Sequence, residues 1–226
     1  MSLLLQIQTV PDSLTNPEIT EKTLSVVDLI TSGGIGGNLV MGALGILSIF
    51  AIYILIERFS AIKKASKEDE NFLKSIQNFV EAKDIEAAKT LCRNTDSPIS
   101  RMIEKGVNRI NKPMTDISAA IENQGKLEVF KMENNLANLA TISGAAPMIG
   151  FLGTVIGMIV AFHEMASAGG NIDVEMLSKG IYTAMTTTVA GLIVGIIAFI
   201  AYNYLVSKVD KVVFMLEAKT TEFLDL

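Results

Sequence analysis

Three long stretches of this chain contain no Asp, Glu, Lys or Arg, and they limit the possible folds more than any other feature. They cover residues 29–56, 134–162 and 180–207. A helix needs about 20 mainly apolar residues to cross the roughly 30 Å hydrocarbon core of a bilayer, and each stretch exceeds that length. We therefore predict an all-α integral membrane protein with three transmembrane helices, of which the second and third extend into a helical cytoplasmic domain.

The placement of the basic residues predicts how the chain lies in the membrane. One Lys or Arg precedes the first stretch, fourteen lie between the first and second, one lies between the second and third, and three follow the third. Cytoplasmic segments of membrane proteins are enriched in Lys and Arg. We therefore expect the N-terminus and the segment 163–179 to face outward, and the segments 58–134 and 206–226 to lie in the cytoplasm.

The segments outside the spans are expected to be largely helical. Helix-type spacing of apolar residues continues through the cytoplasmic segment, and from about Asp116 it runs into the second span. The N-terminal segment contains a candidate amphipathic helix at 23–30, and a disordered outward tail is the alternative for 1–21. The predicted order is an outward segment at 1–34, a span at 35–57, a cytoplasmic domain at 58–134, a span at 135–162, an outward loop at 163–179, a span at 180–205 and a helical tail at 206–226.

Small residues recur along one face of the second span and one face of the third. In lipid, helices associate through close backbone packing, so each face predicts a contact with another helix. Pro147 lacks a backbone donor and is expected to loosen its helix. The second-span face contains Ser143, Pro147, Gly150, Thr154, Gly157 and Ala161, with Gly153 and Gly157 as a small-xxx-small pair. The third-span face contains Thr183, Thr187, Gly191 and Gly195, with Thr188 beside it.

The threonines of the third span leave two interpretations open. Each hydroxyl could bond the carbonyl one turn back and simply pack. Alternatively, Thr187 and Thr188 could line a polar path together with Thr154 of the second span. No Asp, Glu, Lys, Arg or His lies within the three charge-free stretches. If protons cross this membrane here, another subunit must supply the titrating group.

Four charged or titratable residues are expected at the membrane surfaces. Glu57 and Arg58 end the first span, and we expect them to form an ion pair at the inner surface. His163 and Glu164 end the second span at the outer surface. They are interpreted either as interfacial caps or as the place where protons enter.

The sequence also argues against several other classes of function. It contains no nucleophile–histidine arrangement, no GxxxxGK phosphate loop and no metal-ligand spacing, so we expect neither an enzyme nor a cofactor or metal site. The single cysteine, Cys92, is expected to be a small packed hydrophobe. The net charge of −5 gives no reason to expect nucleic-acid binding.

The second and third spans carry motifs that resemble those of a known family. The second-span motif contains Leu139, Ala140, Thr141, Ile142, Ala146, Pro147, Gly150, Leu152, Gly153, Thr154 and Val155. The third-span motif contains Gly180, Ile181, Ala184, Thr187, Thr188, Gly191, Tyr202 and Asn203. Together they resemble the signatures of the MotA/TolQ/ExbB proton-channel family, and most closely those of ExbB and TolQ. The resemblance covers nearly the whole chain from about Leu24.

The resemblance implies a multi-pass protein of the bacterial inner membrane that converts proton motive force into work. The family's architecture implies a homopentamer around two single-span, ExbD-like partner helices, each of which brings an intramembrane Asp. Thr154 and Thr188 match the family's pore positions, and the work would pass to a TonB-like protein for outer-membrane uptake. A TolQ-like role in envelope maintenance, a non-conducting scaffold and coupling to Na⁺ remain as alternatives.

Two positions depart from the family pattern. The family often has a Glu where this chain has Thr183, which removes one titrating group and places more weight on the Asp of the partner. The family's third-span proline falls at Ile197, so we expect a straighter third helix.

Overall fold

The computed structural model describes residues 34–66, 70–167 and 174–225, and every regular element in these ranges is an α-helix. The candidate amphipathic helix at 23–30 lies outside them. The helices are α2 (Gly34–Ala65), α3 (Glu70–Glu81), α4 (Ile85–Asn94), α5 (Pro98–Val107), α6 (Met114–Glu133), α7 (Leu136–Ser167) and α8 (Val174–Leu224).

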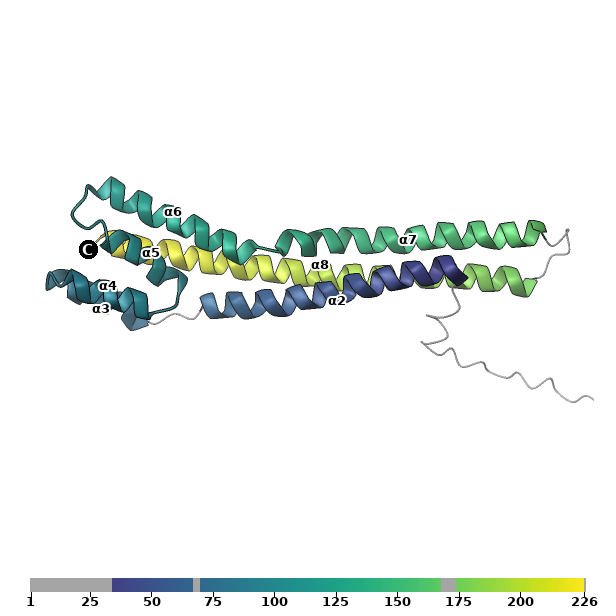
Figure 1. Cartoon of the computed structure of the whole chain (residues 1–226), viewed down its shortest axis with the longest axis horizontal. Helices are drawn as coiled ribbons and strands as arrows, with labels where there is room; N and C mark the ends of the chain where they lie inside the picture. The colour runs from purple at the N-terminus through teal and green to yellow at the C-terminus, as the bar shows by residue number, and fades with distance from the viewer. Residues whose placement is uncertain (1–33, 67–69, 168–173, 226) are drawn as a thin grey trace, which may run out of the picture.

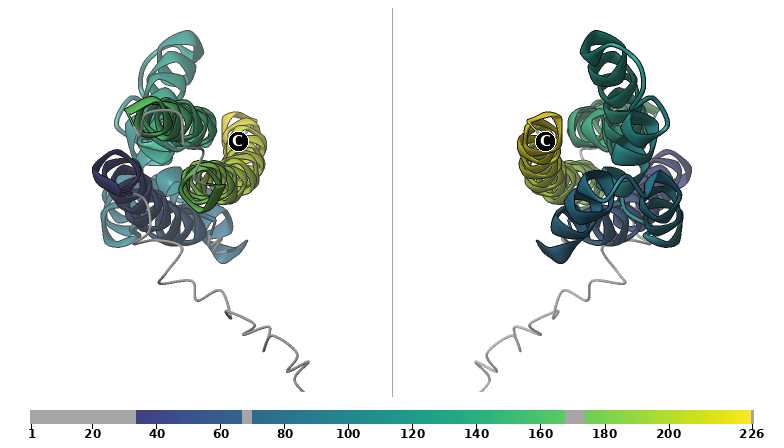
Figure 2. Two further views of the ribbon diagram at one scale, coloured as in Figure 1. Left: turned by 90° about the vertical axis from the view of Figure 1, so that its right-hand side faces the viewer. Right: turned by 90° about the vertical axis from the view of Figure 1, so that its left-hand side faces the viewer.

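Three long helices, α2, α7 and α8, lie side by side in an elongated bundle, and α8 continues beyond the other two toward the end of the molecule that holds the C-terminus (Figure 1). Seen end on, α2, α7 and α8 occupy the corners of a triangle (Figure 2). In the described chain, three helical segments are long and apolar enough to cross a membrane. Helices α2, α7 and α8 each belong to one of them. The predicted class, an all-α protein with three spans, is confirmed.

A break at Asn134–Asn135 separates α6 from α7. We expected the helical pattern to continue from Asp116 into the second span, and this expectation was wrong at this point. Asn135 has a φ of 64°, in the left-handed region that Asn tolerates better than most residues. The helical pattern that precedes the second span therefore forms a separate helix, α6, outside the charge-free stretch.

The outer ends of α7 and α8 continue beyond the charge-free stretches. Helix α7 includes His163 and Glu164 and ends at Ser167, and α8 begins at Val174. A helix satisfies its own backbone hydrogen bonds, so it does not have to stop where the hydrocarbon ends. Helix α8 runs unbroken for 51 residues, through Ile197 and beyond the third charge-free stretch to Leu224.

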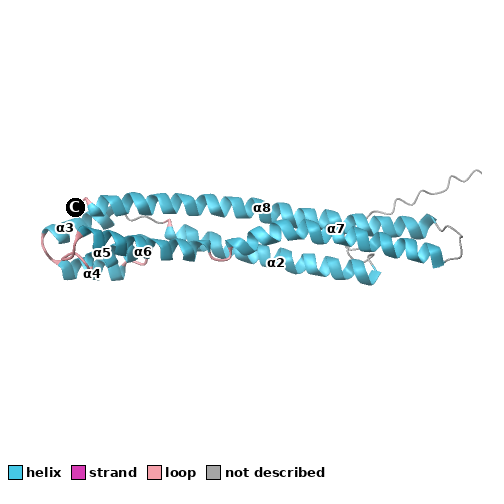
Figure 3. Ribbon diagram, turned by 90° about the horizontal axis from the view of Figure 1, so that it is seen from above, coloured by secondary structure: helices cyan, strands magenta, loops and turns pink. Residues whose placement is uncertain are grey.

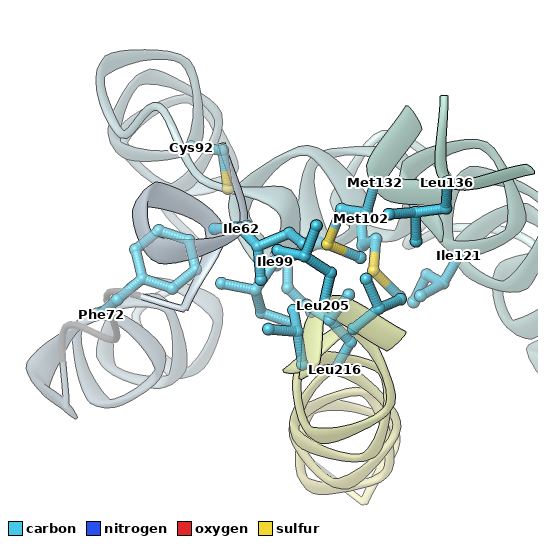
Figure 4. Close-up of a cluster of buried hydrophobic side chains, with 14 of the residues drawn as sticks. Ile62, Phe72, Cys92, Ile99, Met102, Ile121, Met132, Leu136, Leu205 and Leu216 are labelled. Atoms are coloured by element: carbon cyan, nitrogen blue, oxygen red, sulfur yellow. The ribbon is translucent and has the colours of Figure 1, made fainter. Parts of the chain in front are cut away.

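Helices α3 to α6 gather around the inner end of α8, at the end of the molecule that also holds the C-terminus (Figures 1 and 3). Their apolar faces meet the inner ends of α2 and α8 in one core (Figure 4). All seven described helices contribute side chains to this core, among them Ile62, Phe72, Cys92, Ile121 and Leu216.

The start of α5 and the environment of Cys92 agree with their sequence. Ser97, the residue before α5, forms a capping box with Ser100 in the first turn of that helix. Pro98 is the first residue of α5, where a proline is favoured. Cys92 is 2% exposed, and burial followed by the nearby Glu104 raises the pKa of its thiol to about 12. The thiol is therefore a packed, protonated group.

Candidate functional site

Helices α7 and α8 touch through their backbones. A Cβ atom placed on Gly191 would lie 2.6 Å from the carbonyl oxygen of Ala146, and one on Gly150 would lie 2.8 Å from that of Thr187. Real Cβ atoms do not come this close to backbone oxygens. The two glycine faces singled out in the sequence thus face each other, and the contact requires that neither carries a side chain.

The same close contact continues along both helices. A Cβ on Gly157 would lie 2.9 Å from that of Ala184, and one on Gly195 would lie 2.6 Å from Cγ of Pro147. Pro147 lies inside the continuous helix α7, so its ring fills the space opposite Gly195. It also leaves the carbonyl of Ser143 without its normal helical donor, and that carbonyl faces Gly195 as well.

The third-span threonines fall into two groups by what their hydroxyls bind. The hydroxyl of Thr188 donates across to the carbonyl oxygen of Gly150 at 3.0 Å. That of Thr187 donates to Ala184 at 2.7 Å and lies 3.3 Å from the same Gly150 oxygen. Thr186 bonds only the carbonyl of Tyr182, one turn back. Two hydroxyls of α8 therefore converge on one carbonyl of α7.

Exposure separates the three candidate path threonines. Thr187 is 1% exposed and lies inside the three-helix bundle, where it also contacts Gly153. Thr154 and Thr188 are half-buried, and Thr154 donates to the carbonyl of Phe151 on its own helix. Of these three threonines, only Thr154 and Thr188 keep part of their surface open to another helix within a single chain.

Thr183 lies on the side of α8 that faces α2. It is buried, and its Cγ2 would be 3.3 Å from a Cβ on Gly37. A Cβ placed on Gly36, a second glycine of α2, would lie 3.0 Å from Cγ2 of Ile156 on α7. The contact faces expected from the sequence lay on the second and third spans alone, so these contacts of the first span were missed, although Gly36 and Gly37 carried the signal.

The predicted ion pair between Glu57 and Arg58 is present. Arg58 donates to the carboxylate of Glu57, and its Nη1 donates to the carbonyl oxygen of Lys131 at 2.9 Å. Arg58 thus binds the open C-terminal end of α6, where a cation is favoured. His163 and Glu164 are exposed at the other end of α7, and His163 lies nine residues, or about 14 Å, along the helix from Thr154.

A buried carboxylate in the cytoplasmic part was missed by the sequence analysis. Glu128 is 2% exposed, yet it accepts hydrogen bonds from Arg101 at 2.7 and 3.0 Å, from Gln124 at 2.8 Å and from Lys131 at 2.9 Å. Arg101 also binds Asp96, which pairs with Lys64. In the sequence, the polar residues around Glu128 look like an ordinary solvent face, so no signal marked it.

The part of the protein formed by α3 to α6 should lose stability in acid because of Glu128. Burial acts to raise the pKa of this carboxyl, but the hydrogen bonds and charges of Arg101 and Lys131 outweigh burial and lower it. A lowered folded-state pKa stabilises the fold above the unfolded pKa of about 4.3 and stops doing so as pH falls through the folded value. We expect the unfolding temperature, measured by circular dichroism in detergent, to fall below about pH 4.3 less steeply in Glu128→Gln than in the wild type. If the unfolding temperatures of the variant and the wild type fell equally steeply with pH, Glu128 would not be the cause of the loss of stability in acid.

The comparison with known families agrees with this geometry. The sequence model of the MotA/TolQ/ExbB proton channel family matches residues 94–218, which include α5 to α7 and most of α8. The chain belongs to this family. The ExbB- and TolQ-like resemblance of its motifs is thereby confirmed, and the family is one of proton channels rather than of enzymes.

Individual relatives carry ExbB and TolQ names. A putative biopolymer transport protein ExbB homolog from Methanothermobacter thermautotrophicus is 26% identical over 82% of this chain and 64% of its own length. The biopolymer transport protein ExbB of Helicobacter pylori is 40% identical over 35% of this chain and 54% of its own length. The Tol-Pal system protein TolQ of Pseudomonas aeruginosa is 25% identical over 83% of this chain and 85% of its own length. The chain thus spans between about half and two thirds of the two ExbB-named relatives.

The family match includes the whole α7–α8 contact of this MotA/TolQ/ExbB member, and it excludes α2. The three charge-free spans and the family membership make the chain a multi-pass membrane protein. Among the residues that the structure describes, no cluster of three or more His, Cys, Asp or Glu could hold a metal ion.

Proposed function

We propose that this chain is the multi-copy wall of a proton channel whose titrating carboxylate comes from a partner subunit. The chemistry of the α7–α8 face is the observation that supports this. It offers threonine hydroxyls and a shared backbone carbonyl, whereas residues 134–162 and 180–207 contain no Asp, Glu, Lys, Arg or His. Proteins that carry protons through a membrane usually place an ionisable side chain there, so this wall needs one from outside.

Thr154 and Thr188 are the residues proposed to meet that carboxylate. The hydroxyl hydrogen of Thr188 is used on Gly150, which leaves the oxygen lone pairs of Thr188 to accept a hydrogen bond from a protonated Asp. Thr154 has the same arrangement, since its hydrogen is used on Phe151. Thr187 is proposed to support the path from inside by fixing the Gly150 carbonyl, because it is buried within the bundle.

The proposed assembly follows the family's architecture. Five copies of the chain would surround two single-span, ExbD-like helices in the inner membrane, with the N-terminus periplasmic and the C-terminus cytoplasmic. The distribution of Lys and Arg supports this orientation. Each proton that crosses 100 mV supplies about 2.3 kcal/mol, and this energy would be passed to a TonB-like protein for uptake across an outer membrane.

A TolQ-like role in envelope maintenance is the second candidate. It is supported by the Pseudomonas aeruginosa TolQ protein, of which the match covers 85%. Both roles use the same proposed proton path. They differ in the protein that receives the work, so uptake and envelope phenotypes in deletion strains distinguish them.

The proton path is tested by replacing each candidate hydroxyl with a methyl group. We expect Thr188→Val and Thr154→Val to slow partner-dependent proton uptake into proteoliposomes about tenfold, because losing one hydrogen bond of about 1 to 1.5 kcal/mol in the limiting step has that effect. The measurement is the rate of internal acidification, read with a pH-sensitive dye after a membrane potential is imposed. Repeating it with a Na⁺ gradient tests the alternative coupling ion.

Thr186→Val is the matched control, since Thr186 neighbours Thr187 and bonds only its own helix. It should leave the rate within about twofold of the wild type. Native mass measurement of each variant should give the same five-copy complex with its small partner. Normal proton uptake in Thr154→Val and Thr188→Val, with assembly intact, would support a non-conducting scaffold instead.

A further inference from the structure

A groove of about 390 Å³ lies between the inner ends of α2 and α8. Two residue stripes with helical spacing line it, Phe59 and Lys63 on α2, and Tyr204, Lys208 and Lys211 on α8. Residues three, four and seven positions apart share a helix face, so each stripe points into the groove along its whole length.

Among the described residues that line the groove, the only charged side chains are lysines. Lys63, Lys208 and Lys211 line it, and none of its described lining residues is acidic. Within the part of the chain that the structure describes, these three lysines form no ion pair. The neighbouring Lys64, by contrast, lies 2.6 Å from a carboxylate oxygen of Asp96. Three lysines around one groove without a carboxylate indicate a site for an anion.

The groove also has an aromatic and apolar side. The rings of Phe59 and Tyr204 stack at a centroid distance of 6.3 Å, and Nζ of Lys208 lies 5.4 Å from the centre of the Tyr204 ring. The buried side chains of Ile62 and Leu205 form its floor. A free inorganic anion would make no favourable contact with this apolar surface.

The position of the groove matches the inner surface of the bilayer. The first charge-free stretch ends at residue 56 and the third at residue 207, so Phe59 and Tyr204 lie close to the edge of the hydrocarbon core. Aromatic side chains favour this level, and lysines reach from it toward the headgroups. On the membrane side, Ile56 and Ile200 continue the two stripes, and each is 62% exposed.

We propose that this groove binds an anionic phospholipid at the inner surface of the membrane. Lys63, Lys208 and Lys211 hold its phosphate, and the acyl chains lie along the exposed faces of α2 and α8 at Ile56 and Ile200. Basic pockets between membrane helices on the cytoplasmic side suit such headgroups. A phospholipid uses both halves of the groove, the lysines and the apolar stripes, which a soluble phosphate compound does not.

The test compares the full chain with Lys63→Gln/Lys208→Gln/Lys211→Gln. Both are reconstituted in nanodiscs of equal parts phosphatidylglycerol and phosphatidylcholine, extracted in mild detergent, and analysed for retained lipid by native mass spectrometry. We expect the wild type to retain phosphatidylglycerol in preference. A basic residue near an anionic surface contributes about fivefold to binding, so the triple variant should lose roughly 10- to 100-fold of this preference.

The matched control is Lys74→Gln/Lys105→Gln/Lys112→Gln, which removes the same charge from exposed lysines that do not line the groove. It should keep the preference of the wild type. Two results would overturn the proposal. One is equal lipid retention by the groove variant and the wild type at equal helicity. The other is displacement of phosphatidylglycerol by millimolar inorganic phosphate, which would assign the groove to a soluble anion.

Discussion

Replacing Gly191 with alanine should destabilise the bundle of this protein more than any other single methyl group added to its spans. The new Cβ would lie 2.6 Å from the carbonyl oxygen of Ala146 and close to the backbone of Gly150. A side chain can turn away from such an overlap, but two helix backbones can only move apart. Overpacking of this kind costs about 1 to 3 kcal/mol, and separation would also lengthen the Thr188–Gly150 hydrogen bond. We expect a lower unfolding temperature in detergent, measured by circular dichroism.

Gly144→Ala is the control for this prediction. Gly144 is an exposed glycine of α7, and a Cβ placed on it meets nothing within 4 Å. It should unfold within about 0.5 kcal/mol of the wild type, as surface changes generally do. If both alanine variants lost the same stability, the effect would come from alanine in these helices in general, and the α7–α8 backbone contact would not be its cause.

Arg101→Met should produce the second large effect, in the cytoplasmic part. Arg101 supplies two of the four hydrogen bonds that Glu128 accepts. Removing it leaves a carboxylate that is only 2% exposed with Gln124 and Lys131 alone. Breaking a buried ion pair from one side costs about 3 to 5 kcal/mol. We expect a smaller loss than that range, about 2 to 3 kcal/mol, because two donors remain. Denaturant unfolding in detergent measures it.

Two further variants isolate the cause of that loss. Arg101→Met/Glu128→Met removes the buried charge as well, so it should be more stable than Arg101→Met alone. Lys64→Met breaks an ion pair of which both side chains are 69% exposed, and it should change stability by less than about 1 kcal/mol. If the double variant were no more stable than Arg101→Met, the unpaired charge of Glu128 would not be the cause of the stability lost in Arg101→Met.

The sequence predicted the membrane part of the fold well because bilayer physics acts on composition. Charge-free length identifies a span, and small residues at three- and four-residue steps identify a contact face. For this reason Gly150, Gly157, Gly191 and Gly195 could be assigned to helix contacts from their spacing alone. The partner of each face could not be assigned, since spacing does not say which helix fills it.

Features that depend on tertiary contacts were beyond the sequence. The break at Asn135 required one residue in the left-handed region, and Asn adopts helical conformations as well. The burial of Glu128 depends on Arg101 approaching from another helix, 27 positions away. Thr187 and Thr188 are neighbours in sequence, yet only the packed structure shows that one is enclosed and the other remains partly open.

The unbroken length of α8 has a mechanical consequence. Its 51 residues make a rod about 77 Å long, and Thr188 and Leu216 lie about 42 Å apart on that one rod. A tilt or rotation that begins beside Thr188 therefore reaches the cytoplasmic core without passing through a flexible connection. Helices α6 and α7, by contrast, are separated by the break at Asn134–Asn135. Arg58 of α2 binds the end of α6 just before this break, since it donates to the carbonyl oxygen of Lys131. We therefore expect α8 to transmit a movement as one rigid rod, and α6 and α7 to bend relative to each other at the break between them.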